Sequence, residues 1–250
     1  MSGFRHLLAG TAIVLLASAA GAAPIPVGSI QFGVATTAED GTPLETWDHV
    51  YAGVQDPTDP NLYTWGDGYW AGTGVYLDWS EVEADLDPFV SGNWAITNTS
   101  GSTQIITLTI DLPVIALPST LMYGTSSISV LDANGIGGAT LASVAALALY
   151  NGRIDLAAVT PSTNLFGPGY SMVVGLLGSD SETQTFGVAP GSIPGPGVVG
   201  FIGIQHTFSL TAGDRATFNS LFSVVLPEPG TLLLVLAGLG GLAFLGRRRA

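Results

Sequence analysis

Apolar and polar residues alternate along the central part of the chain with a period of two, which is typical of half-buried β-strands. Between residues 106 and 112, isoleucine and leucine occupy one phase, and threonine and aspartate occupy the other. The segment 89–97 is similarly rich in β-branched and aromatic residues, and the turn-rich sequence 98–102 separates the two. We therefore predict a half-buried hairpin formed by strands at 89–97 and 104–112.

The alternation changes phase near Ser80. Val75, Leu77 and Trp79 share one phase, whereas from Val82 onward the apolar positions are shifted by one residue. A β-bulge at Ser80 explains the shift, because one extra residue reverses the faces of a strand. A short helix with Ser80 and Glu83 as its capping box is the alternative. Strict alternation on both sides favours the bulged strand.

Further strands follow toward the C-terminus. Asn151-Gly152 lies between the apolar segments 147–150 and 153–156, which predicts a tight hairpin turn. The Ala-rich stretch 139–149 is also compatible with a helix.

Another alternating segment, 204–210, places His206 in the inward phase. A turn at 211–214 leads from it to a last strand at 216–224, whereas 189–197, rich in Pro and Gly, predicts an irregular loop. Eight or more strands at this spacing predict one antiparallel β-sandwich, jelly-roll-like, over residues 23–225. We call residues 23–225 the ectodomain.

Composition supports short strands joined by turns, since the chain has 34 Gly, 15 Pro and no Cys. The charge is strongly acidic. Between residues 23 and 226, Arg153 and Arg215 stand against 18 Asp and Glu residues, and the chain has no Lys. Such a surface lacks the cations that neutralise phosphates, so nucleic acid and anionic lipid are poor partners for it, and we expect no binding of nucleic acid. Divalent cations and neutral polysaccharides are compatible partners.

The N-terminus has the three parts of a secretory signal peptide. Arg5 precedes the apolar run 7–17, and small residues follow it. Ala20 and Ala22 fit the small-x-small rule for cleavage by signal peptidase. We therefore expect residues 1–22 to direct the chain to the secretion translocon and to be removed.

The C-terminus predicts a membrane-inserted tail at residues 226–250. Residues 230–246 are uncharged and would span about 25 Å as a helix, which is close to the thickness of a hydrocarbon core. Arg247, Arg248 and Arg249 follow directly, and positive charge stays on the cytoplasmic side. The ectodomain is thus expected outside the inner membrane.

Pro227-Glu228-Pro229 stands just before this helix and holds the backbone extended. With the apolar helix and the cluster of three arginines, the tail resembles the PEP-CTERM sorting signal. Segments 87–89, 93–99, 112–114 and 131–135 resemble, more weakly, the ectodomains of many PEP-CTERM proteins. That second resemblance implies a β-sandwich and brings no activity.

The resemblance of the tail implies a Gram-negative bacterium that makes an exopolysaccharide and carries an exosortase. It implies that Pro227, Glu228 and Pro229, together with the arginine cluster, are read by the exosortase at the inner membrane. The protein would cross that membrane transiently through its tail and reach the cell surface or the extracellular matrix.

The residues offer little for catalysis. The ectodomain has no Cys, no Lys and two His, and Asp48 beside His49 is not accompanied by a Gly-x-Ser-x-Gly motif. Two isolated His do not make a zinc site. Twelve carboxylates between Glu39 and Asp87 suit calcium, but the sequences 56–59 and 132–135 are only fragments of a calcium loop, so a solvated acidic face is favoured. We therefore expect no metal site and no cofactor, with calcium left open.

The acidic region is also rich in aromatic residues. Trp65, Tyr69 and Trp70 would form a sugar-stacking platform if exposed, or part of the core if buried. The sequence as a whole predicts an exported, non-enzymatic surface or biofilm-matrix protein, with exopolysaccharide as an expected partner. A calcium-dependent carbohydrate-binding module and an extracellular glycoside hydrolase are the alternatives.

Overall fold

A computed structural model describes residues 26, 28–86, 88–189 and 191–227, which form seventeen β-strands and no helix. The predicted signal peptide, with Arg5, Ala20 and Ala22, lies outside the described residues, as do Glu228, Pro229, the predicted helix 230–246 and the arginine cluster. The strands are β1 (Ser29–Ala38), β2 (Pro43–Ala52), β3 (Val54–Gln55), β4 (Leu62–Trp65), β5 (Gly68–Ala71), β6 (Val75–Asp85), β7 (Phe89–Asn98), β8 (Gln104–Pro113), β9 (Thr120–Leu131), β10 (Ala139–Ser143), β11 (Tyr150–Ile154), β12 (Ala157–Ala158), β13 (Ser171–Val174), β14 (Ser179–Phe186), β15 (Ile193–Gly195), β16 (Phe201–Leu210) and β17 (Arg215–Val225).

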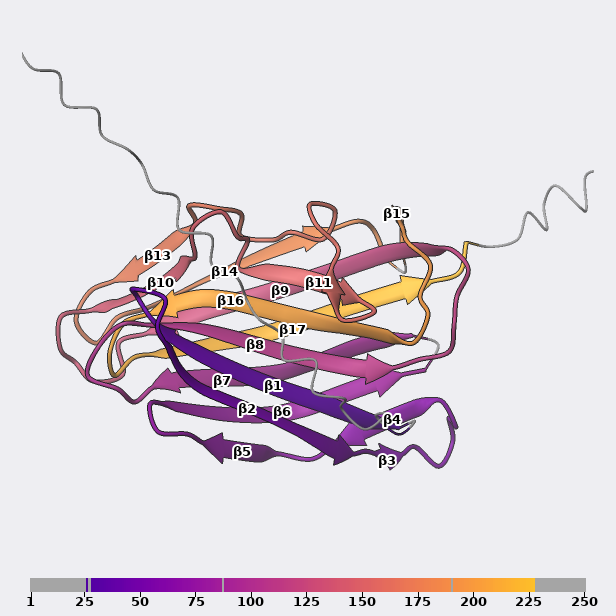
Figure 1. Ribbon diagram of the computed structural model, residues 1–250, viewed down its shortest axis with the longest axis horizontal. Coiled ribbons are helices and arrows are strands. Elements are labelled where there is room, and N and C mark those ends of the chain that lie inside the picture. Colours follow the sequence, from indigo (N-terminus) through magenta and orange to yellow (C-terminus); the bar gives the residue numbers. More distant parts are fainter. Residues whose placement is uncertain (1–25, 27, 87, 190, 228–250) are drawn as a thin grey trace, which may run out of the picture.

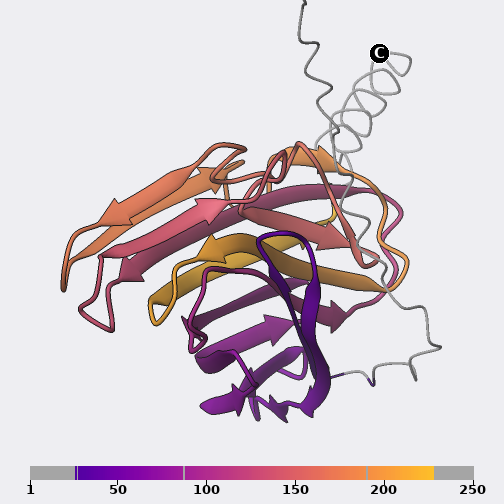
Figure 2. The ribbon, with the colours of Figure 1, turned by 60° about the vertical axis from the view of Figure 1, so that its left-hand side comes forward.

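These strands form two antiparallel sheets. Sheet A has the order β12-β11-β16-β8-β1-β2, with β10 pairing both β16 and β13. Sheet B has the order β14-β9-β17-β7-β6-β4-β3, with β15 added beside β9 and β5 beside β6. The two sheets lie as layers over one another (Figures 1 and 2). The prediction of a mostly β, antiparallel fold is confirmed.

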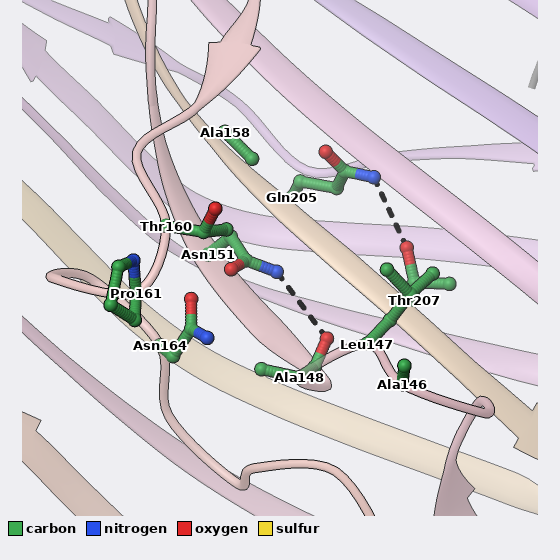
Figure 3. A pocket seen from close by; sticks show the side chains of 10 residues that line it. All are labelled: Ala146, Leu147, Ala148, Asn151, Ala158, Thr160, Pro161, Asn164, Gln205 and Thr207. Atoms are coloured by element: carbon green, nitrogen blue, oxygen red, sulfur yellow. Dashed lines mark hydrogen bonds between the residues drawn. The ribbon is translucent and has the colours of Figure 1, made fainter.

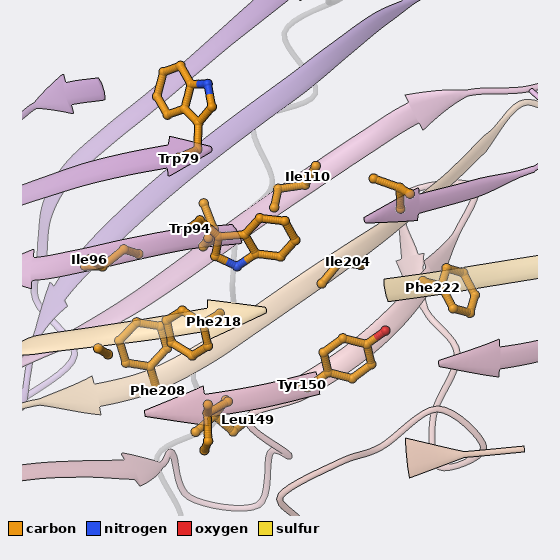
Figure 4. Packing of buried hydrophobic residues seen from close by; sticks show 14 of the residues in the cluster. Trp79, Trp94, Ile96, Ile110, Leu149, Tyr150, Ile204, Phe208, Phe218 and Phe222 are labelled. Carbon is orange, nitrogen blue, oxygen red and sulfur yellow. The ribbon is translucent and has the colours of Figure 1, made fainter. Parts of the chain in front are cut away.

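The inward phase of each strand builds a shared core between the sheets. Phe208 of sheet A packs against Phe218 of sheet B with ring centroids 5.0 Å apart (Figure 4). Phe32 stacks on Trp79 with ring centroids 4.9 Å apart. Burying one such large apolar side chain contributes about 1.5–3 kcal/mol, so the alternation itself supplies most of the driving force for layering. The strands predicted at 89–97, 104–112, 204–210 and 216–224 are present as β7, β8, β16 and β17.

The phase change near Ser80 is a β-bulge, as favoured. Strand β6 is continuous from Val75 to Asp85, and its register with β7 shifts between Ser80 and Glu83. Glu81 lies within this bulge and has a φ of 51°. The alternative of a short helix at this position is wrong.

The predicted hairpin at 89–112 is wrong in its pairing, although both strands exist. Strand β7 belongs to sheet B between β6 and β17, whereas β8 belongs to sheet A between β1 and β16. The connection at 98–104 therefore crosses from one sheet to the other. Asn98, which is completely buried, holds it there by donating to the carbonyl oxygens of Ser102 and Leu210, both at 2.8 Å. Alternation predicts which face a residue takes but not which strand it pairs with.

The hairpin predicted at Asn151-Gly152 is displaced along the chain. Both residues lie inside β11, opposite Gln205 and Ile204 of β16. The chain reverses instead at 155–156, where Asp155 and Leu156 have φ of 50° and 67°, the signs of a type I′ turn. The stretch 139–149 contains β10 and turns and no helix, and the loop predicted at 189–197 contains the short strand β15.

Candidate functional site

The C-terminal tail follows directly in sequence after β17, a strand in the interior of sheet B. Strand β17 lies between β7 and β9, and its last residue, Val225, pairs with Leu121. Next along the chain, Leu226 exposes 50% of its surface, and Pro227 is half-buried. The Pro-Glu-Pro sequence therefore begins two residues after the end of a central strand, with Leu226 between them.

The three aromatic residues predicted as a sugar platform do not share one surface. Trp65 exposes only 5% of its surface, and its indole N–H donates to the Tyr51 carbonyl at 3.0 Å. Tyr69 and Trp70 are neighbours on β5, so their side chains point to opposite faces of the strand. Trp65 thus belongs to the core, and only Tyr69 and Trp70 remain accessible.

Trp70 helps to close one edge of the molecule. Its ring stacks on Trp47 of β2 with centroids 4.8 Å apart, and the His49 ring also stacks on Trp47, with centroids 6.0 Å apart. Glu45 adds a polar link, since its Oε2 accepts a hydrogen bond from the Thr73 amide at 2.9 Å. These contacts join the edge strand of sheet A to β5 of sheet B, which gives Trp47 and Trp70 a structural role.

Tyr69 lies on the outer face of sheet B. It exposes 69% of its surface and stacks on Tyr76, with ring centroids 5.8 Å apart and planes 21° from parallel. The two rings line a shallow groove of about 300 Å³ that also contains Asp67 and Asp78. Asp78 is paired with Arg215 at 2.8 Å. The groove combines an exposed aromatic face with carboxylate acceptors, which is the chemistry that a sugar ring requires.

His206 occupies the inward position that its phase predicts. It is fully buried among aromatic rings, and burial lowers its pKa to about 3, so the imidazole is neutral. Its Nε2 lies 3.3 Å from the Ser220 hydroxyl, which in turn contacts the Ser126 hydroxyl at 2.7 Å. This serine–histidine contact is enclosed in the core, and Nδ1 has no partner among the described residues to orient the ring.

The carboxylates in the two fragments of a calcium loop accept hydrogen bonds from backbone amides. The Asp56 carboxylate accepts hydrogen bonds from the Thr58 and Asp59 amides at 2.7 and 3.1 Å. Asp132 accepts from the Gly135 and Leu177 amides at 2.7 and 3.0 Å. Within the described residues, no group of three or more His, Cys, Asp or Glu side chains is arranged to hold a metal ion.

A second polar region, which the sequence did not indicate, lies on the outer face of sheet A. A cleft of about 480 Å³ is formed where irregular segments around β11 and β12 fold over β16 (Figure 3). Its polar side chains are Asn151, Thr160, Asn164, Gln205 and Thr207. Gln205 and Thr207 occupy the outward phase of β16, and this phase was the sequence signal that could have indicated polar residues on this face. The segments that cover them became evident only in the fold.

Near the cleft, the same sheet face carries a buried ion pair. The Arg153 guanidinium lies 2.8 Å from the Asp111 carboxylate, across the position of Gly203. Burial raises the pKa of Asp111 to about 6, while Arg153 opposes this rise and Asp48 adds to it.

Comparison with known families places a defined motif at the end of β17. The PEP-CTERM protein-sorting motif matches residues 225–249. No curated protein matches the chain. The motif implies export, a membrane-anchored C-terminal sorting signal and recognition by an exosortase, and therefore an exosortase-targeted surface protein. The part of the chain that the structure describes contains no helix long and apolar enough to cross a membrane, and the predicted helix 230–246 lies beyond it.

Proposed function

We propose that this chain is an exported β-sandwich protein of the cell surface or biofilm matrix, without catalysis of its own, whose tail is processed by an exosortase-type protease. The observation that carries the proposal is the sorting motif at 225–249, which begins at the last residue of β17. Because a folded strand cannot enter a protease site, we expect the exosortase to recognise the peptide that follows Val225, where Leu226 exposes 50% of its surface.

Processing is tested in a host that contains an exosortase. We expect the extracellular protein to lack every peptide beyond the Pro-Glu-Pro region when it is analysed by mass spectrometry. Replacing Glu228 by Ala should leave unprocessed chain in the inner membrane, whereas replacing the exposed Glu83 of β6 by Ala should not. Recovery of Arg249 in secreted protein, or normal processing in a strain without exosortase, would contradict the proposal.

The absence of catalysis is proposed from the state of the histidines. His206 is neutral and enclosed, and His49 stacks on Trp47 at the molecular edge. A serine nucleophile needs an accessible base oriented by a third group. We expect no turnover when the purified protein is incubated with the exopolysaccharide of its host. Release of reducing ends would favour a glycoside hydrolase instead.

Carbohydrate binding is a second candidate function, favoured by the exposed Tyr69–Tyr76 stack. In this candidate a sugar ring lies on Tyr69, and Asp67 accepts hydrogen bonds from its hydroxyls. Replacing Tyr69 by Ala should then weaken glycan binding by about 5- to 150-fold, from the roughly 1–3 kcal/mol of a stacked ring. Tyr123→Ala is the matched control, because Tyr123 lies on β9 of the same outer face.

Calcium dependence of this binding is tested by titration of calcium chloride into protein pretreated with a chelator. A binding heat that disappears with Asp67→Asn would support a calcium-dependent module. Equal glycan binding with and without the chelator would leave the aromatic stack as the basis of recognition.

A further inference from the structure

The cleft on the outer face of sheet A is shaped by fixed walls. Thr163, which is completely buried, accepts a hydrogen bond from the Gly152 amide at 3.0 Å, and its hydroxyl lies 2.9 Å from the Val159 carbonyl. Leu165 and Tyr150 exchange backbone hydrogen bonds at 3.1 and 3.2 Å. The segment between β12 and Leu165 is thereby attached to β11, so the cleft is formed before any ligand enters.

The floor of the cleft contains amide groups with unused acceptors. Asn151 exposes 5% of its surface and donates from Nδ2 to the Ala148 carbonyl at 3.3 Å, which determines the orientation of its amide. Its Oδ1, and the Oδ1 of Asn164, have no partner among the described residues. Figure 3 shows these two side chains beside Thr160 in one part of the cleft.

The lining is free of charge. The ten lining residues include no Asp, Glu, Lys, Arg or His. Arg153 and Arg215, the arginines among the described residues, are already paired with Asp111 and Asp78. An anionic ligand would therefore meet no cation and would be repelled by the acidic molecule, and a cationic ligand would meet no carboxylate in the cleft.

We propose that this cleft binds a neutral, hydroxyl-rich glycan segment. Hydroxyl groups of the ligand donate to the amide oxygens of Asn164 and Asn151, and Gln205 and Thr160 provide further polar contacts. The side chains of Leu147 and Pro161 offer apolar surface to the C–H groups of a sugar ring. The inference rests on the extracellular location in the proposed function, because the protein meets polysaccharide there.

A peptide strand fits this cleft less well than a glycan. A peptide that joins a sheet needs free backbone groups at a sheet edge. Here the floor is the face of the sheet, where β16 is already paired with both β11 and β8. Recognition must therefore come from side-chain amides and hydroxyls, which suits a ligand that carries its own hydroxyl groups.

The test uses the full-length chain in a detergent without a sugar headgroup. Neutral gluco-, manno-, galacto- and xylo-oligosaccharides and the purified host exopolysaccharide are titrated calorimetrically, with polygalacturonate as the anionic probe. We expect at least one neutral glycan to bind and polygalacturonate not to bind. Asn164→Leu should weaken that binding about 3- to 10-fold, the loss expected for one hydrogen bond.

Two further variants separate recognition from folding. Asn164→Asp keeps the acceptor oxygens and should retain binding of the neutral glycan, whereas Gln205→Ala should weaken it. Asn93→Leu, which removes an amide from the outer face of sheet B, should leave it unchanged. Thermal unfolding of each variant verifies that the fold is intact.

No binding of any neutral glycan, or equal affinity in Asn164→Leu and the unchanged chain, would overturn the proposal. Binding of a peptide library at this cleft in place of glycans would overturn it as well. The titration requires no exosortase, so a failure here leaves tail processing intact and is distinguishable from a failure of the proposed function.

Discussion

Replacing Asn98 by Ala should destabilise the protein more than any other single amide substitution in the described chain. Asn98 ends β7 at the point where the chain crosses from sheet B to sheet A. Its Nδ2 donates to the carbonyl oxygens of Ser102, Leu210 and Thr211, at 2.8, 2.8 and 3.1 Å. Its Oδ1 accepts hydrogen bonds from the Ser100 amide at 3.0 Å and the Ser100 hydroxyl at 2.6 Å. One side chain therefore joins two connections between the sheets.

The magnitude follows from these contacts. Two N–H groups and two accepted hydrogen bonds amount to four net interactions at about 1 kcal/mol each. The Leu210 carbonyl is left without this donor in a buried place, so solvent does not compensate for its loss. We expect the free energy of unfolding to fall by about 3–5 kcal/mol, a large part of the roughly 5–15 kcal/mol of a typical domain.

Urea unfolding of the full-length chain, followed by tryptophan fluorescence, measures this change. All five Trp lie between residues 47 and 94, and Trp94 exposes 1% of its surface, so the signal reports on this part of the fold. Asn134→Ala is the matched control. Its exposed amide donates to the Ala212 carbonyl and accepts from the Ile136 amide, both at 2.6 Å, and should cost about 1 kcal/mol. If the two variants lose the same stability, the reasoning is refuted.

Three further predictions concern buried or turn-forming charges. Burial raises the pKa of Asp111 from its ordinary 3.8 to about 6, so its contribution to stability should fall as the pH rises from 3.8 to 6. Asp111→Asn should remove this slope from a series of urea midpoints measured at different pH. The pH dependence that His206 contributes has the opposite sign. Burial lowers the pKa of His206 from 6.5 to about 3, so stability should fall as the pH drops from 6.5 toward 3. An unchanged slope of stability against pH in this range for His206→Gln would contradict this. Asp155→Ala should cost about 2–4 kcal/mol, since its carboxylate accepts from the Val199, Gly200 and Phe201 amides at 2.8–3.1 Å, whereas the exposed Glu182→Ala should cost under about 0.5 kcal/mol.

Sequence reasoning succeeded where the signal is local. The bulge at Ser80 was predicted because alternation on either side of it had opposite phase, and the structure has the register shift there. The inward position of His206 followed from the same periodicity. The tail was recognised from a short linear motif, which is read as a sequence and requires no fold.

It failed where the answer depends on partners distant in the chain. The turn-rich sequence after Asn98 resembles a hairpin loop, yet it crosses between sheets because Asn98 bonds to a carbonyl 112 residues away. Asn151-Gly152 is a strong turn signal, but pairing with β16 holds it within a strand and moves the reversal to 155–156. The aromatic residues near β5 showed the same limit, since neighbouring residues with similar side chains ended in the core and on the surface.

The sequence by itself determined the β character of the ectodomain, the two faces of each strand and the address carried by the tail. The tertiary structure alone decided which strands pair, which aromatic rings are exposed and where the amides of β11, β16 and the segment after β12 meet in a cleft. The reason is physical: periodicity and short motifs are properties of neighbouring residues, whereas pairing and cleft formation depend on which segments the burial of a shared core brings together.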